Sequence, residues 1–167
     1  AIFFNYCEMC SAGSRLIVQE SVREQVLEKI ATVGRELKPG DPLDPATSLG
    51  AIVDETQMNT VLRYIDAGKS EGARVALGGK RVREETGGFY VEPTVFDHVG
   101  NQMTIAREEI FGPVLAVLGF DDEDEAVALA NQSMYGLAAG VWSRDIGRAH
   151  RVAHAIRAGT VWVNTYN

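Results

Sequence analysis

The chain has 167 residues, of which 46% are hydrophobic and 23% charged, and this length and composition are typical of a single globular domain. Its net charge of −7 argues against a nucleic-acid-binding surface, because such surfaces are built from clustered Lys and Arg. No apolar run approaches the roughly 20 residues that cross a bilayer, so we expect neither a membrane partner nor a signal peptide. The 2 cysteines exclude a disulfide scaffold and favour a reducing, cytoplasmic setting.

Apolar residues recur alternately at helical and at strand spacing along the chain. Helices are expected over residues 21–37, 54–68, 121–131 and 145–157, and strands over residues 16–18, 75–77, 89–91, 94–96, 114–120, 137–142 and 161–163. Ser21 and Glu24 have the spacing of a capping box, which predicts the start of the first helix. Asp54 with Gln57 predicts the start of the second helix, and Gly68 its end. Strands alternating with helices predict an α/β fold with three layers, α/β/α, around a mostly parallel sheet.

A cysteine followed by small residues is the first chemical feature of the chain. Residues 3–15 read Phe-Phe-Asn-Tyr-Cys-Glu-Met-Cys-Ser-Ala-Gly-Ser-Arg, and they place Cys10 shortly before the first strand. A thiolate is a strong nucleophile, and small neighbours leave room for a substrate carbon and for backbone N–H groups. The alternative is a buried structural cysteine, because a free Cys packs well as a small hydrophobe.

The second chemical feature is a loop before the most apolar strand. Residues 108–114 read Glu-Glu-Ile-Phe-Gly-Pro-Val. A carboxylate there can bind both hydroxyls of a nicotinamide ribose, and an aromatic edge can press on the nicotinamide ring. By chemistry alone, this is only a loop before a strand, and such a Glu pair is usually a solvated face.

The two features together resemble the NAD(P)-dependent aldehyde dehydrogenases, whose active-site cysteine follows a Gly-Gln or Gly-Glu pair by one residue and whose second motif is Glu-Glu-Ile-Phe-Gly-Pro. The resemblance implies that Cys10 is the catalytic nucleophile, that Glu109 binds the ribose of NAD or NADP, and that Phe111 flanks the nicotinamide. Gln57 falls on a helix that reaches the cofactor ribose in some relatives, although an exposed helix glutamine is the plainer interpretation. Cys7 departs from the family, which has glycine there.

The resemblance extends over nearly the whole chain, through residues 88–95, 131–139 and 159–164, and it suggests that Asn164 hydrogen-bonds near the site. It implies oxidation of an aldehyde through a cysteine thiohemiacetal and a thioester. The region 135–137 and the ending 164–167 are similar to those of relatives acting on amino- or betaine-type aldehydes. The choice between NAD and NADP stays open.

Parts of the family's active site lie upstream of the cysteine motif: the cofactor domain, the general-base glutamate and the oxyanion asparagine side chain. We therefore expect residues 1–167 to be a single domain, most of a catalytic domain, without the cofactor-binding domain. The chain starts at Ala1 and stops after an apolar strand, so both ends look cut. We expect this chain to be inactive alone, and we expect the complete enzyme to form a homo-oligomer.

Three alternatives remain. Cys7 and Cys10 form a C-x-x-C pair, as in thiol redox proteins, but such pairs follow a strand and this one precedes a strand. His150 and His154 share a helix face, but nearby arginines disfavour a metal, and we expect none. The third alternative is a non-catalytic α/β module that serves assembly or regulation.

Overall fold

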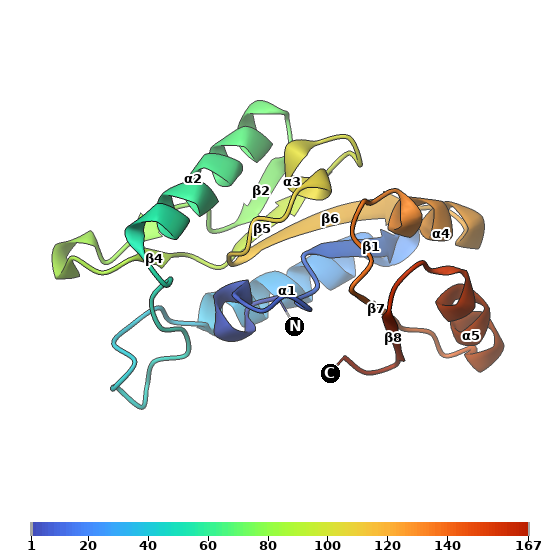
Figure 1. Ribbon diagram of the computed structural model, residues 1–167, viewed down its shortest axis with the longest axis horizontal. Helices are drawn as coiled ribbons and strands as arrows, with labels where there is room; N and C mark the ends of the chain where they lie inside the picture. Colours follow the sequence, from blue (N-terminus) through green and yellow to red (C-terminus); the bar gives the residue numbers. More distant parts are fainter. Residues whose placement is uncertain (1, 167) are drawn as a thin grey trace.

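A four-stranded sheet in the order β1-β6-β5-β2 forms the centre of the molecule (Figure 1). The computed structural model describes residues 2–166. The strands are β1 (Arg15–Gln19), β2 (Arg74–Leu77), β5 (Thr94–Asp97) and β6 (Val114–Phe120). β6 pairs in parallel with both β1 and β5, and only β2 at the edge is antiparallel. The predicted α/β fold with a mostly parallel sheet is confirmed.

Helices cover both faces of this sheet, because successive strand side chains point to opposite sides. On β6, Val114, Ala116 and Leu118 pack in one core cluster with residues of α2 (Glu55–Ser70). The alternate residues, Leu115 and Val117, pack in a second cluster with α1 (Arg23–Glu36). The layers are therefore α2, sheet and α1, as Figure 1 shows.

A smaller parallel pair lies at one end of the molecule. β7 (Ala138–Val141) pairs with β8 (Thr160–Val163), and α5 (Ile146–Ala155) connects them. The preceding helix, α4 (Glu123–Asn131), is tied to the main sheet by Arg15, whose guanidinium donates to the carbonyl groups of Leu129 and Ala130. This end of the chain therefore sits next to the strand that follows Cys10.

The remaining elements are short, and of these only β4 corresponds to a predicted strand. They are η1 (Phe4–Cys7), η2 (Glu20–Val22), β3 (Arg81–Val82), η3 (Glu84–Thr86), β4 (Tyr90–Val91) and α3 (Thr104–Arg107). The strand expected at 89–91 corresponds to β4, and it pairs with β3 rather than with the main sheet. Every helix within residues 2–166 is too short or too polar to span a membrane.

Two boundary predictions were wrong. Ser21 lies in η2 and makes no cap, because α1 begins at Arg23 with Val22 at its N-cap. α2 continues past Gly68 to Ser70, since that glycine serves close packing: a Cβ on it would lie 2.9 Å from Ile105 of α3. In contrast, the Asp54 start is confirmed, because its side chain accepts from the Gln57 N–H at 2.7 Å.

Candidate active site

Cys10 lies at the tip of a four-residue turn, Met9–Ala12. The Ala12 N–H closes the turn by donating to the Met9 carbonyl at 2.9 Å. The thiol of Cys10 is free and exposed, and β1 begins at Arg15, shortly after the turn. The main sheet therefore holds one end of the segment that presents this sulfur, and the alternative of a buried structural cysteine does not hold for Cys10.

The backbone just before this turn is strained. Asn5, Tyr6 and Cys7 have φ angles of 49°, 55° and 61°, a left-handed conformation that residues with a side chain rarely adopt. The aldehyde dehydrogenases that this chain resembles have glycine at the position of Cys7, and glycine adopts this conformation without strain. Cys7 carries a Cβ and adopts it at a cost in free energy. Strain of this kind gathers at functional sites, where the surrounding contacts maintain it.

Cys7 is buried and free, and its thiol accepts a hydrogen bond from the backbone of Gly112 in the second motif. Burial raises the pKa of its thiol to about 11, and a backbone hydrogen bond from Gly112 offsets this only in part. The negative charge of Glu109 raises the pKa further. Cys7 is therefore protonated near neutral pH and unsuited to nucleophilic attack. Because Gly112 and Glu109 both act on the Cys7 thiol, residues 109–112 lie beside the segment that leads to Cys10.

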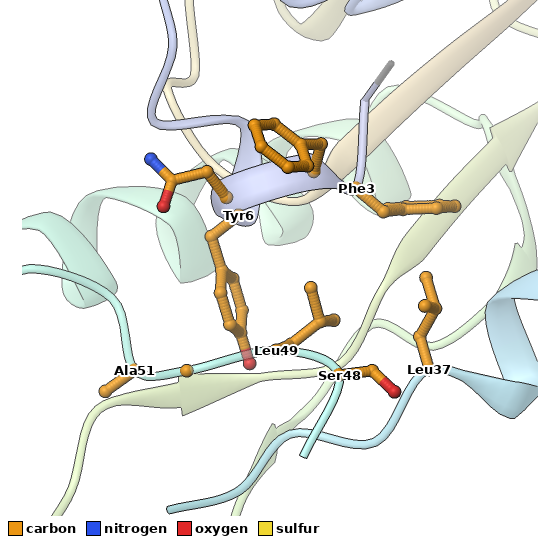
Figure 2. A pocket seen from close by; sticks show the side chains of 9 residues that line it. Phe3, Tyr6, Leu37, Ser48, Leu49 and Ala51 are labelled. Atoms are coloured by element: carbon orange, nitrogen blue, oxygen red, sulfur yellow. The ribbon is translucent and has the colours of Figure 1, made fainter. Parts of the chain in front are cut away.

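A hollow of about 470 Å³ lies next to η1, on the side of the 48–51 loop (Figure 2). Its lining is largely apolar and consists of Phe3, Phe4, Asn5, Tyr6, Leu37, Ser48, Leu49, Gly50 and Ala51. Tyr6 is buried, and its hydroxyl has no hydrogen-bond partner within residues 2–166. Cys10 and Glu109 do not line this hollow.

The loop between α3 and β6 carries the second motif and is held by α2 and by a tyrosine near β7. The side-chain amide of Gln57 donates to the carbonyl groups of Ile110 and Phe111, each at 2.9 Å. The Tyr64 hydroxyl donates to the Glu108 carboxylate at 2.8 Å. In addition, the Glu109 N–H donates to the Tyr135 hydroxyl at 3.3 Å.

These contacts distinguish the two acidic residues of the loop. The Glu108 carboxylate is occupied by Tyr64, whereas the Glu109 side chain is exposed and makes no hydrogen bond or ion pair with residues 2–166. Phe111 is half-buried with a left-handed φ of 53°, and a Cβ on the next residue, Gly112, would clash with Val61 of α2. The loop thus presents one free carboxylate and one aromatic side chain on a tightly packed backbone.

Sequence reasoning missed the three tyrosines that fix the two motifs. Tyr64 binds the Glu108 carboxylate, and Tyr135 accepts from the Glu109 N–H. Tyr166 donates to the Ser11 carbonyl at 2.6 Å. Tyrosine spacing carries no signal for contacts made across the fold. The side chain of Asn164, for which the resemblance suggests a hydrogen bond near the site, exchanges hydrogen bonds with the backbone of Ser143 at the end of the β7–β8 pair. Asn167 of the same ending lies outside the described residues.

Residues 2–166 contain no group of three or more His, Cys, Asp or Glu side chains that could hold a metal ion. His150 and His154 do share a face of α5, with ring centroids 6.5 Å apart. The ring Nδ1 of His154 lies 2.9 Å from the His150 carbonyl oxygen, within the same helix.

The whole chain matches one protein family. The model of the "Aldehyde dehydrogenase family" covers residues 1–167. The chain is 48% identical over 167 residues to a betaine aldehyde dehydrogenase of Brucella anthropi, with 99% of this chain and 34% of that protein covered. It therefore spans about a third of the length of this relative.

Solved structures give the same picture. An indole-3-acetaldehyde dehydrogenase in complex with NAD+ is 56% identical with a TM-score of 0.94, covering 96% of this chain and 32% of that chain. A gamma-glutamyl-gamma-aminobutyraldehyde dehydrogenase from Burkholderia cenocepacia is 55% identical with a TM-score of 0.96, covering 99% of this chain and 33% of that chain.

Proposed function

Because this chain belongs to the aldehyde dehydrogenase family, we propose that the complete protein oxidises an aldehyde to a carboxylic acid with NAD or NADP, with Cys10 as the nucleophile. One observation carries the proposal. Cys10 is an exposed thiol on a turn, and Cys7, just before it, is packed against the loop that carries Glu109 and Phe111. The nucleophile and the proposed cofactor residues therefore belong to neighbouring loops.

The chemistry starts with attack of the Cys10 thiolate on the aldehyde carbon, which forms a C–S bond and places negative charge on the former carbonyl oxygen. The N–H groups of Cys10 and Ser11 lie at the tip of the turn and make no hydrogen bond within residues 2–166, so they are available as donors to this oxyanion. NAD(P), when bound, accepts the hydride from the same carbon, so that a thioester to Cys10 remains. Water then cleaves the C–S bond of the thioester and releases the carboxylic acid, the Cys10 thiolate and one proton.

The loop residues fit a nicotinamide ribose. The carboxylate of Glu109 is free to accept from two hydroxyl groups, and Phe111 offers an aromatic surface two residues further on. Gln57 is joined to this site through the loop, since its amide nitrogen already donates to Ile110 and Phe111. Its side-chain oxygen is left to accept from a ribose hydroxyl.

We place residues 1–167 in the catalytic domain of the complete protein. Relatives are about three times as long, since this chain covers 32% to 34% of them, and their additional length is the proposed source of the cofactor domain and the general base. The isolated chain is accordingly expected to be inactive, and the complete enzyme to be a homo-oligomer. Steady NADH production from an aldehyde by the isolated chain would contradict this part of the proposal.

The proposed substrate is an aldehyde that carries nitrogen. Betaine aldehyde and gamma-glutamyl-gamma-aminobutyraldehyde, the substrates named for two close relatives, share that feature. The kcat/KM of the complete protein for betaine aldehyde and 4-aminobutyraldehyde should exceed that for propanal and hexanal. Equal or higher values for the plain alkyl aldehydes would contradict this substrate class.

Substitution of the two cysteines tests the nucleophile. Cys10→Ser in the complete protein is expected to lower kcat for NADH formation by about 10⁴-fold or more, because a serine hydroxyl is a far weaker nucleophile. Cys7→Ser is the matched control, and it should retain most of the activity, since the buried thiol takes no part in the reaction. A Cys10→Ser variant with the activity of the unaltered protein would rule out the proposal.

A further inference from the structure

Tyr166 connects the C-terminal part of the chain to the turn that carries Cys10. It follows β8 and reaches a residue 155 positions away, where its hydroxyl donates to the Ser11 carbonyl at 2.6 Å. In Figure 1 the segment after β8 accordingly returns to the side of the molecule where the N-terminal segment lies. Burial raises the pKa of the Tyr166 hydroxyl, so this group remains a donor at neutral pH.

Two tryptophans fix the ring of Tyr166. The Trp142 ring is stacked on it, with ring centroids 6.0 Å apart and planes inclined by 8°. The Trp162 ring packs at 4.6 Å with a tilt of 45°. Trp162 lies in β8 and Trp142 directly follows β7, so this end of the fold holds the phenol in one orientation.

The hydrogen bond of Tyr166 completes the attachment of one peptide unit. The Ser11–Ala12 peptide group has its N–H bound to the Met9 carbonyl at 2.9 Å and its C=O bound to Tyr166. With both polar groups engaged, this planar unit cannot rotate without losing two hydrogen bonds. Rotation of the unit would turn the backbone next to Cys10.

A second anchor acts on the other side of the nucleophile. The Glu8 carboxylate accepts from the Val53 N–H at 3.0 Å, and the Glu8 N–H donates to the Asn5 carbonyl at 2.9 Å. The residues before and after Cys10 are thus attached to separate parts of the fold. The Cys10 side chain itself stays exposed.

We propose that Tyr166 is a positioning residue for Cys10. This inference rests on the proposed function: the hydroxyl of Tyr166 locks the Ser11–Ala12 peptide, so the sulfur and the turn N–H groups keep one arrangement toward the aldehyde carbon. A bound geometry close to that of attack contributes strongly to rate, and a misplacement of about 1 Å costs about 100-fold. A hydroxyl 155 residues from Ser11 thereby sets the geometry of the proposed reaction.

Tyr166→Phe in the complete protein tests the proposal, because it removes the hydroxyl and keeps the ring that contacts Trp142 and Trp162. We expect kcat to fall about 10-fold while KM for the aldehyde changes less than about 2-fold, as for an interaction that acts on the reacting geometry. The rate of Cys10 alkylation by iodoacetamide should change as well. Tyr90→Phe is the matched control: it removes a hydroxyl that makes no hydrogen bond within residues 2–166, so the alkylation rate should stay that of the unaltered protein.

The outcomes separate the two proposals. If Tyr166→Phe lowers only the melting temperature and leaves kcat and the alkylation rate unchanged, Tyr166 is merely structural and the inference is overturned. If Cys10→Ser keeps full activity, the proposed function itself fails, whatever Tyr166→Phe does. Loss of activity in Cys10→Ser together with unaltered kinetics in Tyr166→Phe rejects the positioning role alone.

Discussion

The side-chain amide of Gln57 donates to the Phe111 carbonyl at 2.9 Å, although the Phe111 backbone is in the left-handed region with φ of 53°. The same amide binds the preceding carbonyl of Ile110. One helix side chain thereby keeps a strained loop in place. The Phe111 side chain is proposed to face the cofactor. The hydrogen bond from Gln57 to Phe111 therefore links the position of α2 to cofactor binding.

Gln57→Leu should weaken cofactor binding in the complete protein. Leucine has a similar size but no donor, so two carbonyl groups lose their partner and the loop is free to relax. We expect the KM for NAD to rise about 10-fold and the free energy of unfolding to fall by about 1–2 kcal/mol. Gln25→Leu, at an exposed position on α1, is the control and should alter neither quantity. An unchanged KM for NAD in Gln57→Leu would contradict the positioning of this loop by α2.

At position 7, a glycine variant should be more stable to unfolding than an alanine variant, the reverse of the usual order. Both Cys7→Gly and Cys7→Ala lose the buried sulfur, but only Cys7→Gly relieves the left-handed strain, which costs a residue with a Cβ about 1–2 kcal/mol. Urea unfolding should therefore find Cys7→Gly more stable than Cys7→Ala. The opposite order would mean that the backbone at residue 7 is unstrained.

Gly112→Ala should destabilise the chain, because the added Cβ meets Val61 of α2. Overpacking of this kind costs about 1–3 kcal/mol. Val61→Ala alone is also destabilising, since that side chain is fully buried. The double variant should be more stable than the sum of the two losses predicts, because the smaller residue at position 61 makes room for the new methyl group. Additive losses measured by urea unfolding would exclude a direct contact.

Asp97 at the end of β5 should make stability depend on pH. Burial by itself would raise the pKa of this carboxyl, but the hydrogen bond from Arg74 at 2.6 Å, a backbone hydrogen bond, and the charges of Arg23 and His98 lower it overall. With a folded-state pKa below the unfolded value of about 3.9, its contribution is present above that pH and is lost as the pH falls through the folded-state pKa.

Asp97→Asn should therefore lower the free energy of unfolding by about 1 kcal/mol at pH 7, because Arg23 and the largely exposed Arg74 lose the negative charge that they pair with. The difference between this variant and the unaltered chain should shrink when urea unfolding is repeated near pH 3. A difference that is the same at both pH values would contradict the role of the ionised carboxylate.

Features set by residues close together in the sequence were predictable. β6 follows from a continuous apolar run, and the start of α2 follows from the three-residue spacing of Asp54 and Gln57. The Ser21 capping box failed although its spacing is right, because η2 precedes α1 and leaves Val22 at the N-cap. The antiparallel β2 was not foreseen, because strand direction is decided by a partner far along the chain.

The amino-acid sequence by itself determined the family, the layered α/β fold and the candidate residues Cys10, Glu109 and Phe111, because motifs and hydrophobic periods are local properties of a chain. Only the tertiary structure decided which carboxylate of the Glu108–Glu109 pair is free, since the tyrosine that occupies Glu108 lies 44 residues away. It also decided that Tyr166 meets the turn of Cys10. Such contacts depend on how separate elements pack, and spacing along the chain carries no record of that packing.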